Sequence, residues 1–413
     1  MADTGRPPGT EVNGRVPAAG DHTRDDLVAR LLEHLAMVCV TGEEGPIAEH
    51  LEARYRDLGE PVRRIGHSLV IGGQPDGAGV ELAPSADPAG SGPDVAADDR
   101  PLVLLVGHLD VVPPTDADLE PRLDEIDGTE VVVGRGASDM KAGNVVAMRA
   151  FEDRSLRADS PYRLALVLYA GEEGPADGNE LEAVLQAVPW LTDAALAVVL
   201  EPTDGRVELG CLGGLHARVT FTGRQAHSAR PWHGRNALTL AGGFLSELDD
   251  DHVRDVVVDG IAYRDVWSVT QAWTSGLGPE PDPAAARARN VIPGTFTLNL
   301  NLRFAPSRSL HDAERELRER IGTRAEIEVV DRAPPAPPHR SDPVVDAFVT
   351  QVGADVGGKQ AWTDVARFAR YDVPAVNYGP GLTAQAHQRG EHVPVAALVD
   401  ADRRIRRFLD PRV

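Results

Sequence analysis

Cysteine and long apolar runs are both scarce in this sequence. The two cysteines among 413 residues form no Cys-x-x-Cys pattern, which suggests a reduced, cytoplasmic setting. No run approaches the roughly 18 apolar residues of a transmembrane helix, and the N-terminus carries no apolar signal segment. We therefore expect a protein without a membrane partner.

Basic residues are also few. Lysine and arginine number 42 against 64 aspartate and glutamate residues, a formal net charge of −22, which argues against nucleic acid or an acidic membrane as a partner. Only Lys141 and Lys359 are lysines, which looks like coding bias. The length exceeds that of one typical core, so we expect two domains.

Three apolar strands are predicted to end in polar side chains suited to metal binding. Residues 102–106 are continuously apolar, as in a strand buried on both faces, and Gly-His-Leu-Asp follows at 107–110. Similar apolar runs precede Glu172, Glu173 and Glu201. Open α/β sheets usually place their sites at the carboxyl ends of strands, so we expect these side chains to gather there.

A second domain is predicted inside the first. From Gly213 the strands alternate apolar and polar residues, as at 217–222 and 295–303. Helices are predicted near 236–248 and after Ser309. The resulting order of elements is β-α-β-β-α-β, the ferredoxin-like unit. The expected fold class is therefore α/β, a three-layer domain with a mixed sheet and this unit inserted. The expected division is a flexible tail at 1–20, a discontinuous catalytic domain at 21–211 and 334–413, and a lid or dimerisation domain at 212–333.

The candidate site contains imidazoles and carboxylates but no thiolate. Such a set suits Zn²⁺, Co²⁺ or Mn²⁺ better than it suits a structural cysteine site. Taken singly, each acid could be a solvated loop residue or a helix cap, and the first histidine could be bonded only to a neighbour. Their repetition at strand ends favours a shared two-metal site. The candidates are His108, Asp110, Asp139, Glu172, Glu173, Glu201 and His387.

Several motifs resemble the signature of a known enzyme family, the di-zinc aminoacylases, acetylornithine deacetylases and succinyl-diaminopimelate desuccinylases. The resemblance extends nearly end to end. It is carried by GHLD at 107–110, GASDMK at 136–141, GEEG at 171–174, EPT at 201–203 and AH at 386–387. Other segments resemble the actinobacterial-type desuccinylases in particular, namely those at 226–230, 290–293, 303–306, 362–366 and 387–389.

The resemblance implies a two-zinc metallohydrolase with defined ligands. His108 and Glu201 would hold one zinc ion, and Glu173 and His387 would hold the other. Asp139 would bridge the two ions. Cobalt or manganese could substitute for zinc in such a ligand set.

The resemblance also implies roles beside the metals. Asp110 would orient His108, and the peptide after Asp139 would be cis. Glu172 would be the general base, taking a proton from the attacking water and passing it to the leaving amine. At Glu201 the family's aminopeptidases tend to have aspartate, which weighs against that activity.

The inserted domain carries three further candidates. His227 would donate to the oxyanion, and in related dimers the matching histidine reaches the partner's active site, so a homodimer through the lid is expected. Asn290 and Arg303 are candidates for binding substrate carboxylates. Asn290 and Arg303 could equally be polar residues of a sheet face. For His227 the alternative is a lone surface histidine after a strand, and the matched motif at 226–228 weighs against it.

The substrate implied is a small N-acyl amino acid, with N-succinyl-LL-2,6-diaminopimelate as the first hypothesis. In many desuccinylases the glycine that corresponds to Gly210 is followed by an arginine that helps to bind the substrate. Here Cys211 and Leu212 follow it. An acetylornithine-deacetylase-like, carboxypeptidase-like or biosynthetic N-acyl amino acid hydrolase therefore stays open. A catalytically silent metal-binding dimer and a two-metal phosphoesterase are alternatives from other classes. The intact Glu172 argues against the silent dimer, while the Glu-Glu pair and the lid histidine fit acyl chemistry better than phosphoester chemistry.

Overall fold

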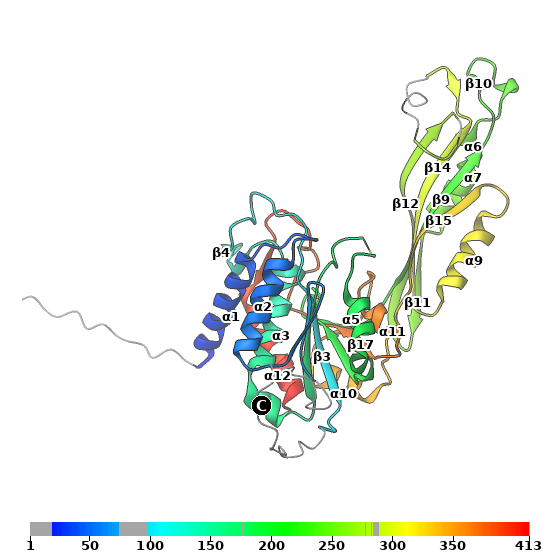
Figure 1. Ribbon diagram of the computed structural model, residues 1–413. Helices are drawn as coiled ribbons and strands as arrows, with labels where there is room; N and C mark the ends of the chain where they lie inside the picture. Colours follow the sequence, from blue (N-terminus) through cyan, green and yellow to red (C-terminus); the bar gives the residue numbers. More distant parts are fainter. Residues whose placement is uncertain are drawn as a thin grey trace, which may run out of the picture.

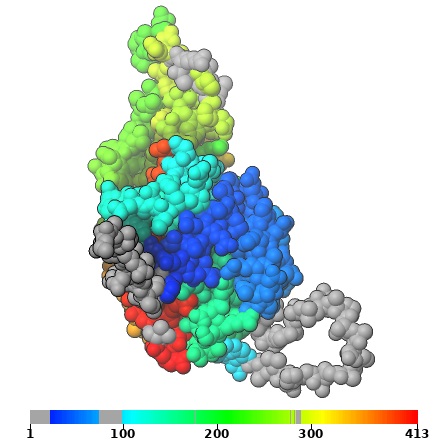
Figure 2. Space-filling model, turned by 90° about the vertical axis from the view of Figure 1, so that its left-hand side faces the viewer, coloured from blue at the N-terminus to red at the C-terminus, as the bar shows by residue number. Residues whose placement is uncertain are grey.

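The computed structural model describes residues 19–73, 98–175, 177–276, 278–281, 283 and 289–412. Most of the expected tail at 1–20 lies outside these residues. So does most of 73–100, a stretch rich in Gly, Pro, Ala and Asp whose composition predicts an exposed loop. An α/β body contains an eight-stranded sheet between helices, and a long, narrow domain built on a five-stranded sheet extends from it (Figure 1). A view turned by 90° shows this extension rising from one end of the body (Figure 2).

The large sheet is mixed. Strands β6, β3 and β7 are neighbours and run parallel, whereas β2 pairs antiparallel with β6. In spatial order the strands are β1 (Val62–Ile65), β2 (Ser68–Gly72), β6 (Arg163–Tyr169), β3 (Leu102–His108), β7 (Leu196–Val199), β17 (Ala375–Asn377), β8 (Val207–Cys211) and β16 (Val356–Lys359).

Alternation along the strands builds a core on each face of this sheet. In β3, Val103 and Leu105 join one apolar cluster, whereas Leu102, Leu104 and Val106 join the other. Because both faces are covered, the strand is apolar throughout, as the sequence indicates. The first cluster is covered by α1 (Ala19–Ala36), α2 (Gly45–Asp57), α3 (Ala142–Glu152), α10 (Pro343–Val352) and α12 (Val395–Leu409), and the second by α5 (Leu181–Ala187) and α11 (Val365–Ala369).

Shorter elements complete the body. A three-stranded sheet has the order β18 (His392–Pro394), β5 (Thr129–Val133) and β4 (Arg122–Ile126). Two helical turns, η1 (Ala137–Lys141) and η2 (Pro189–Asp193), and helix α4 (Arg154–Asp159) lie between the strands along the chain. Among the described helices, none combines the length and apolarity that a membrane crossing requires.

The inserted domain has the predicted ferredoxin-like order with one added edge strand. The four core strands lie in the order β12, β14, β9, β15, and β11 extends the sheet beyond β12. Helix α9 begins with a capping box between Ser309 and Asp312, as expected of a serine before an amphipathic run. The elements are β9 (Gly213–Thr222), β10 (Ala226–His227), η3 (Pro231–His233), α6 (Ala237–Leu240), α7 (Gly242–Asp250), β11 (Val253–Val258), β12 (Ile261–Ser275), β13 (Val291–Ile292), β14 (Thr295–Phe304), α9 (Leu310–Ile321) and β15 (Glu326–Ala333).

Some predicted elements differ from those observed. The sequence at 62–71 predicts one strand, but these residues form a hairpin, because Gly66 adopts a positive φ and turns the chain. The helix expected near 236–248 is broken in two at Ala241. Strand β11 escaped prediction since it lies at a sheet edge and is largely exposed, without an alternating apolar pattern.

Candidate active site

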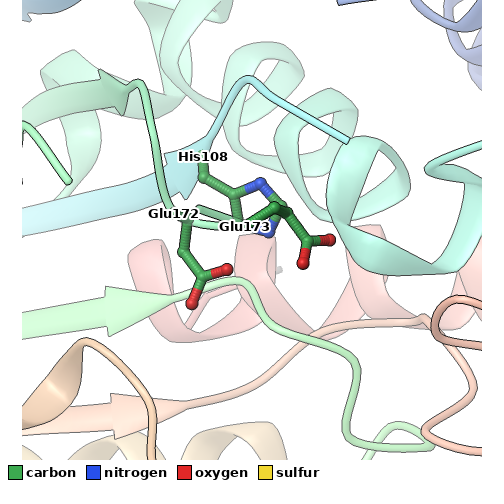
Figure 3. Close-up of side chains that lie close together, drawn as sticks. All are labelled: His108, Glu172 and Glu173. Carbon is green, nitrogen blue, oxygen red and sulfur yellow. The ribbon is translucent and has the colours of Figure 1, made fainter. Parts of the chain in front are cut away.

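Three neighbouring parallel strands bring the predicted side chains to one edge of the large sheet. His108 is the last residue of β3, Glu172 and Glu173 follow β6, and Glu201 follows β7. Potential ligand atoms of His108, Glu172 and Glu173 all lie within 4.8 Å of one another. Figure 3 shows the carboxylates of Glu172 and Glu173 on different sides of the His108 ring.

Asp139 reaches the same place from the helical turn η1 before α3. Its carboxylate lies 3.3 Å from His108 Nε2, and the Asp139–Met140 peptide is cis, as the resemblance implies. The buried carboxylate of Glu391 accepts hydrogen bonds from the backbone N–H groups of Gly136 (3.0 Å), Ser138 (2.8 Å) and Asp139 (2.9 Å). Glu391 therefore fixes the loop that presents Asp139.

His387 completes the cluster from a turn before β18. Its Nε2 is 2.8 Å from Glu173 Oε2 and 3.6 Å from Asp139 Oδ2. The residue has a positive φ of 62°, an uncommon conformation for a side chain other than glycine. About half of the imidazole is exposed, 52%, so this side of the cluster is open to solvent.

The described residues offer two overlapping sets of ligand atoms that share Asp139. One set is His108, Asp139 and Glu201, and the other is Asp139, Glu173 and His387; within each set the atoms lie within 4.8 Å of one another. Two imidazoles and several carboxylates at such short range match the ligands that zinc and similar divalent ions take. The geometry thus permits two adjacent cations with one bridging carboxylate.

Asp110 contacts His108 mainly through its backbone carbonyl. The ring of His108 donates through Nδ1 to the backbone carbonyl of Asp110 at 2.9 Å, while the Asp110 carboxylate is 3.7 Å from that nitrogen. This donation leaves Nε2 as the metal-binding atom. The carboxylate instead accepts from the backbone N–H of Glu172 (3.0 Å) and of Glu173 (3.0 Å), and from the Thr41 hydroxyl (2.9 Å).

Glu172 and Glu201 have raised pKa values because they are buried together with other acids. Burial and the charge of Asp139 raise the pKa of Glu201 to about 8. Burial also raises the pKa of Glu172 well above its usual range, with the charge of Glu201 adding to the effect and His108 opposing it. For His108, burial lowers the pKa, but its hydrogen bond to Asp139 and the surrounding acids outweigh this and raise it. A cluster of this charge is suited to binding cations.

The three candidates of the inserted domain do not join this cluster within one chain. His227 and Asn290 lie beside the pairing of β10 with β13, at the far end of the extension (Figure 1). Arg303 lies near the other end of β14, opposite Gly214. At about 3.4 Å per residue, the ten residues of β14 span about 30 Å. Asn290 and Arg303 therefore cannot contact one small substrate in this arrangement of a single chain.

A cavity of about 560 Å³ opens over the cluster. It is lined by Asp139, Glu172, Glu173, Glu201 and His387, and also by Glu208, Lys359 and Trp362. Sequence reasoning missed Lys359, since lysine was attributed to coding bias, and missed Glu391, which lies only four residues after His387. For Lys359, the scarcity of lysine in the sequence was a signal that could have drawn attention to it. For Glu391 there was none, because no spacing pattern links it to the Asp139 loop.

Comparisons with known proteins agree with this geometry. The model of Peptidase family M20/M25/M40 matches residues 104–410. The "Putative succinyl-diaminopimelate desuccinylase DapE" of Mycobacterium tuberculosis is 37% identical over 308 residues, which are 74% of this chain and 82% of that protein. The succinyl-diaminopimelate desuccinylase of Corynebacterium glutamicum is 34% identical over 312 residues, 74% of this chain and 80% of its own length.

Solved structures share the fold. Aminopeptidase PepT from Bacillus cereus superposes with a TM-score of 0.68 at 17% identity, covering 94% of this chain and 98% of its own. The YXEP protein of Bacillus subtilis, described as a dinuclear metal binding peptidase, gives a TM-score of 0.57 at 12% identity, covering 95% and 99%. With a family model that spans most of its length and relatives above 30% identity, this chain belongs to the M20/M25/M40 family of peptidases.

Proposed function

We propose that this chain is a two-zinc amidohydrolase that cleaves N-succinyl-LL-2,6-diaminopimelate to succinate and LL-2,6-diaminopimelate. The observation that carries the chemistry is the pair of ligand sets sharing Asp139, with Glu172 beside them and outside both. The names of the relatives above 30% identity support the choice of substrate. An acetylornithine-deacetylase-like or carboxypeptidase-like hydrolase is the runner-up.

In this proposal the ligands divide between two zinc sites. His108 and Glu201 would hold one ion, Glu173 and His387 would hold the other, and Asp139, which belongs to both sets, would be shared between them. The donor set fits, because crowded buried carboxylates need compensating positive charge. Bound zinc ions supply Lewis acidity, lowering the pKa of an attacking water toward neutrality and polarising the amide carbonyl.

Glu172 is the proposed general base. Its backbone is held by Asp110, and its carboxylate lies beside His108 without belonging to either ligand set that contains Asp139. It would take the proton from the attacking water and deliver it to the nitrogen of the leaving amine. A buried carboxylate with a raised pKa is suited to holding that proton between the two steps.

His227 is the proposed donor to the oxyanion, supplied by a second subunit. The backbone N–H of Ala229 donates to His227 Nδ1 at 3.1 Å, so the ring carries its proton on Nε2 and can donate from there. The histidine is exposed and far from the cluster of its own chain. A homodimer through the inserted domain would bring His227, and with it Asn290, to the partner's cavity.

The remaining assignments follow from this picture. We propose that Asn290 from one subunit and Arg303 from the other bind substrate carboxylates, since guanidinium and amide groups pair with them. We also propose domain boundaries at 211/212 and 333/334, because β8 belongs to the large sheet and β9 begins the small one, to which β15 also belongs. A cytoplasmic location fits the two buried free cysteines.

A substrate comparison tests the proposal. The zinc-loaded protein should hydrolyse N-succinyl-LL-diaminopimelate with a higher kcat/KM than N-acetylornithine or simple N-acetyl amino acids. Activity confined to one of the latter would replace the desuccinylase assignment with the corresponding deacylase. Absence of amide hydrolysis on every compound, with both zinc ions bound, would favour a silent metal-binding protein.

A further inference from the structure

A buried ion pair in the cavity takes no part in the proposed reaction. Lys359 ends β16 and Glu208 lies on the adjacent β8, and both line the cavity. Lys359 Nζ is 2.9 Å from Glu208 Oε2, and the side chains are only 8% and 15% exposed. Because desolvation offsets much of the attraction in a buried ion pair, stability alone is a weak reason for placing one here.

The ammonium group of Lys359 retains hydrogen-bonding capacity. It donates to the backbone carbonyl of Pro202 at 2.9 Å. Its contact with Glu208 lacks hydrogen-bond geometry, since Glu208 Oε2 accepts no hydrogen bond from the described residues. An ammonium has three N–H donors, so Glu208 balances the charge while donors stay available for a ligand.

Among the described residues that line the cavity, Lys359 is also the only lysine or arginine. The other charged groups there, apart from the imidazole of His387, are carboxylates. Arg303 is absent from the lining in this arrangement. A substrate carboxylate entering the cavity therefore meets one fixed cation of the chain, on the side of Glu201 and Pro202.

We propose that Lys359 binds a carboxylate of the substrate and makes the enzyme selective for acyl amino acids that carry it. This inference rests on the proposed function. The compact ammonium can contact the ligand, Glu208 and the Pro202 carbonyl together. A guanidinium fits such a three-way contact less well, because its N–H donors are fixed in one plane. The proposed substrate has three carboxylates, but the one beside the scissile amide is common to every N-acyl amino acid and gives no selectivity. The two that qualify are that of the succinyl group and that of the unacylated amino acid end.

Three substrates distinguish these sources. N-acetyl-LL-diaminopimelate lacks the acyl carboxylate of the succinyl compound, and Nα-succinyl-L-lysine lacks the distal one. The ratios of kcat/KM between N-succinyl-LL-diaminopimelate and each analogue are measured in the wild-type protein and in the double variant K359M/E208Q. The double variant removes both charges together, so that neither is left buried and unpaired.

One ratio should fall about 10- to 100-fold in the double variant, in line with the loss of a hydrogen bond to a charged group. A fall in the succinyl-to-acetyl ratio assigns the acyl carboxylate, and a fall in the diaminopimelate-to-lysine ratio assigns the distal one. The single variant K359R, which keeps a positive charge beside Glu208, should be more selective than the double variant and less selective than the wild-type protein. If all three substrates slow by the same factor, Lys359 only positions the Glu201–Pro202 loop and the inference is overturned.

A binding measurement separates this inference from the proposed function. Calorimetric titration of the zinc-loaded protein with succinate and with LL-diaminopimelate should show at least one binding, and K359M/E208Q should weaken it about 10-fold or more. Binding that depends on Lys359 in a protein without desuccinylase activity would contradict the reaction but support the inference. Binding of neither compound, or equal binding by wild type and variant, would overturn it.

Discussion

The edge of the large sheet and the inserted domain present their functional candidates in opposite ways. Seven candidates from 108 to 387 converge at the strand ends of one chain, whereas His227 and Asn290 lie at the far end of the extension. The first set is positioned by a core packed on both faces, and the second by a two-residue pairing of β10 with β13. The proposed metal ligands thus come from one chain, whereas the contacts proposed for His227 and Asn290 depend on where the extension of a second subunit is placed.

Replacing the two adjacent glutamates of the sheet edge gives the strongest test of this contrast. E172Q should lower kcat by about 1000-fold, because a positioned general base contributes up to about four orders of magnitude. It should keep both zinc ions, whereas E173Q should lose about one. Metal analysis beside kinetics separates the two; loss of metal from E172Q would make Glu172 a ligand.

Subunit mixing tests whether the extension serves a partner. H227A should lower kcat about 100-fold or more, as for loss of one oxyanion donor. Mixed with inactive E172Q under conditions of proven subunit exchange, it should regain activity, since one hybrid site combines an intact Glu172 with an intact His227. A mixture that stays inactive despite exchange would place His227 in its own chain's site.

The support for the Glu-Glu loop predicts a smaller effect. Asp110 accepts two backbone N–H groups and the Thr41 hydroxyl. D110N replaces one accepting oxygen by a donor and should lower kcat/KM about 10- to 100-fold, a usual range for residues that orient metal-site groups. T41V removes a single donor and serves as the milder control. Full activity of D110N would show that the strand ends position the loop unaided.

The last test concerns the stability of the sheet edge and its pH dependence, where no change in rate is measured. In the folded chain without metal, Glu201 has its pKa raised from 4.5 to about 8, so between these values it holds a proton that the unfolded chain has released. The metal-free protein should therefore lose stability as pH rises through this window. Zinc binding requires Glu201 to be ionised and should therefore remove this pH dependence. It should also raise the free energy of unfolding by about 4 kcal/mol when free zinc is at a thousandfold excess over Kd. Thermal unfolding at about pH 5 and about pH 8, with chelator or zinc and with E201Q as control, measures both.

Much of the large sheet could be predicted because its strands are locally distinctive. Runs such as 102–106 are apolar at every position only where helices cover both faces, and the polar residues that follow mark the strand ends. The inserted domain was predictable from alternation in β9 and β14. Edge strand β11 and the hairpin of β1 and β2 were not, because partner strands and a glycine turn determine them.

Contacts between distant segments could not be predicted from the sequence. Nothing local links Glu391 to the Asp139 loop, or Lys359 to Glu208, since each pair meets only when remote parts of the chain pack together. The same holds in part for Asp110. Its carboxylate lies 3.7 Å from His108 Nδ1, as their spacing indicates, but the hydrogen bonds that it accepts from a loop more than sixty residues away have no local signal.

By itself, the sequence determined which residue types stand at the strand ends, because strand periodicity and ligand chemistry are local properties. These residue types are enough to predict a cation site with one further carboxylate, that of Glu172, beside the ligands. The tertiary structure alone decided that two ligand sets share Asp139 and that a lysine lies in the same cavity. It also placed β10, which contains His227, at the far end of the inserted domain (Figure 1). These outcomes depend on packing between segments far apart in the chain, which no local pattern encodes.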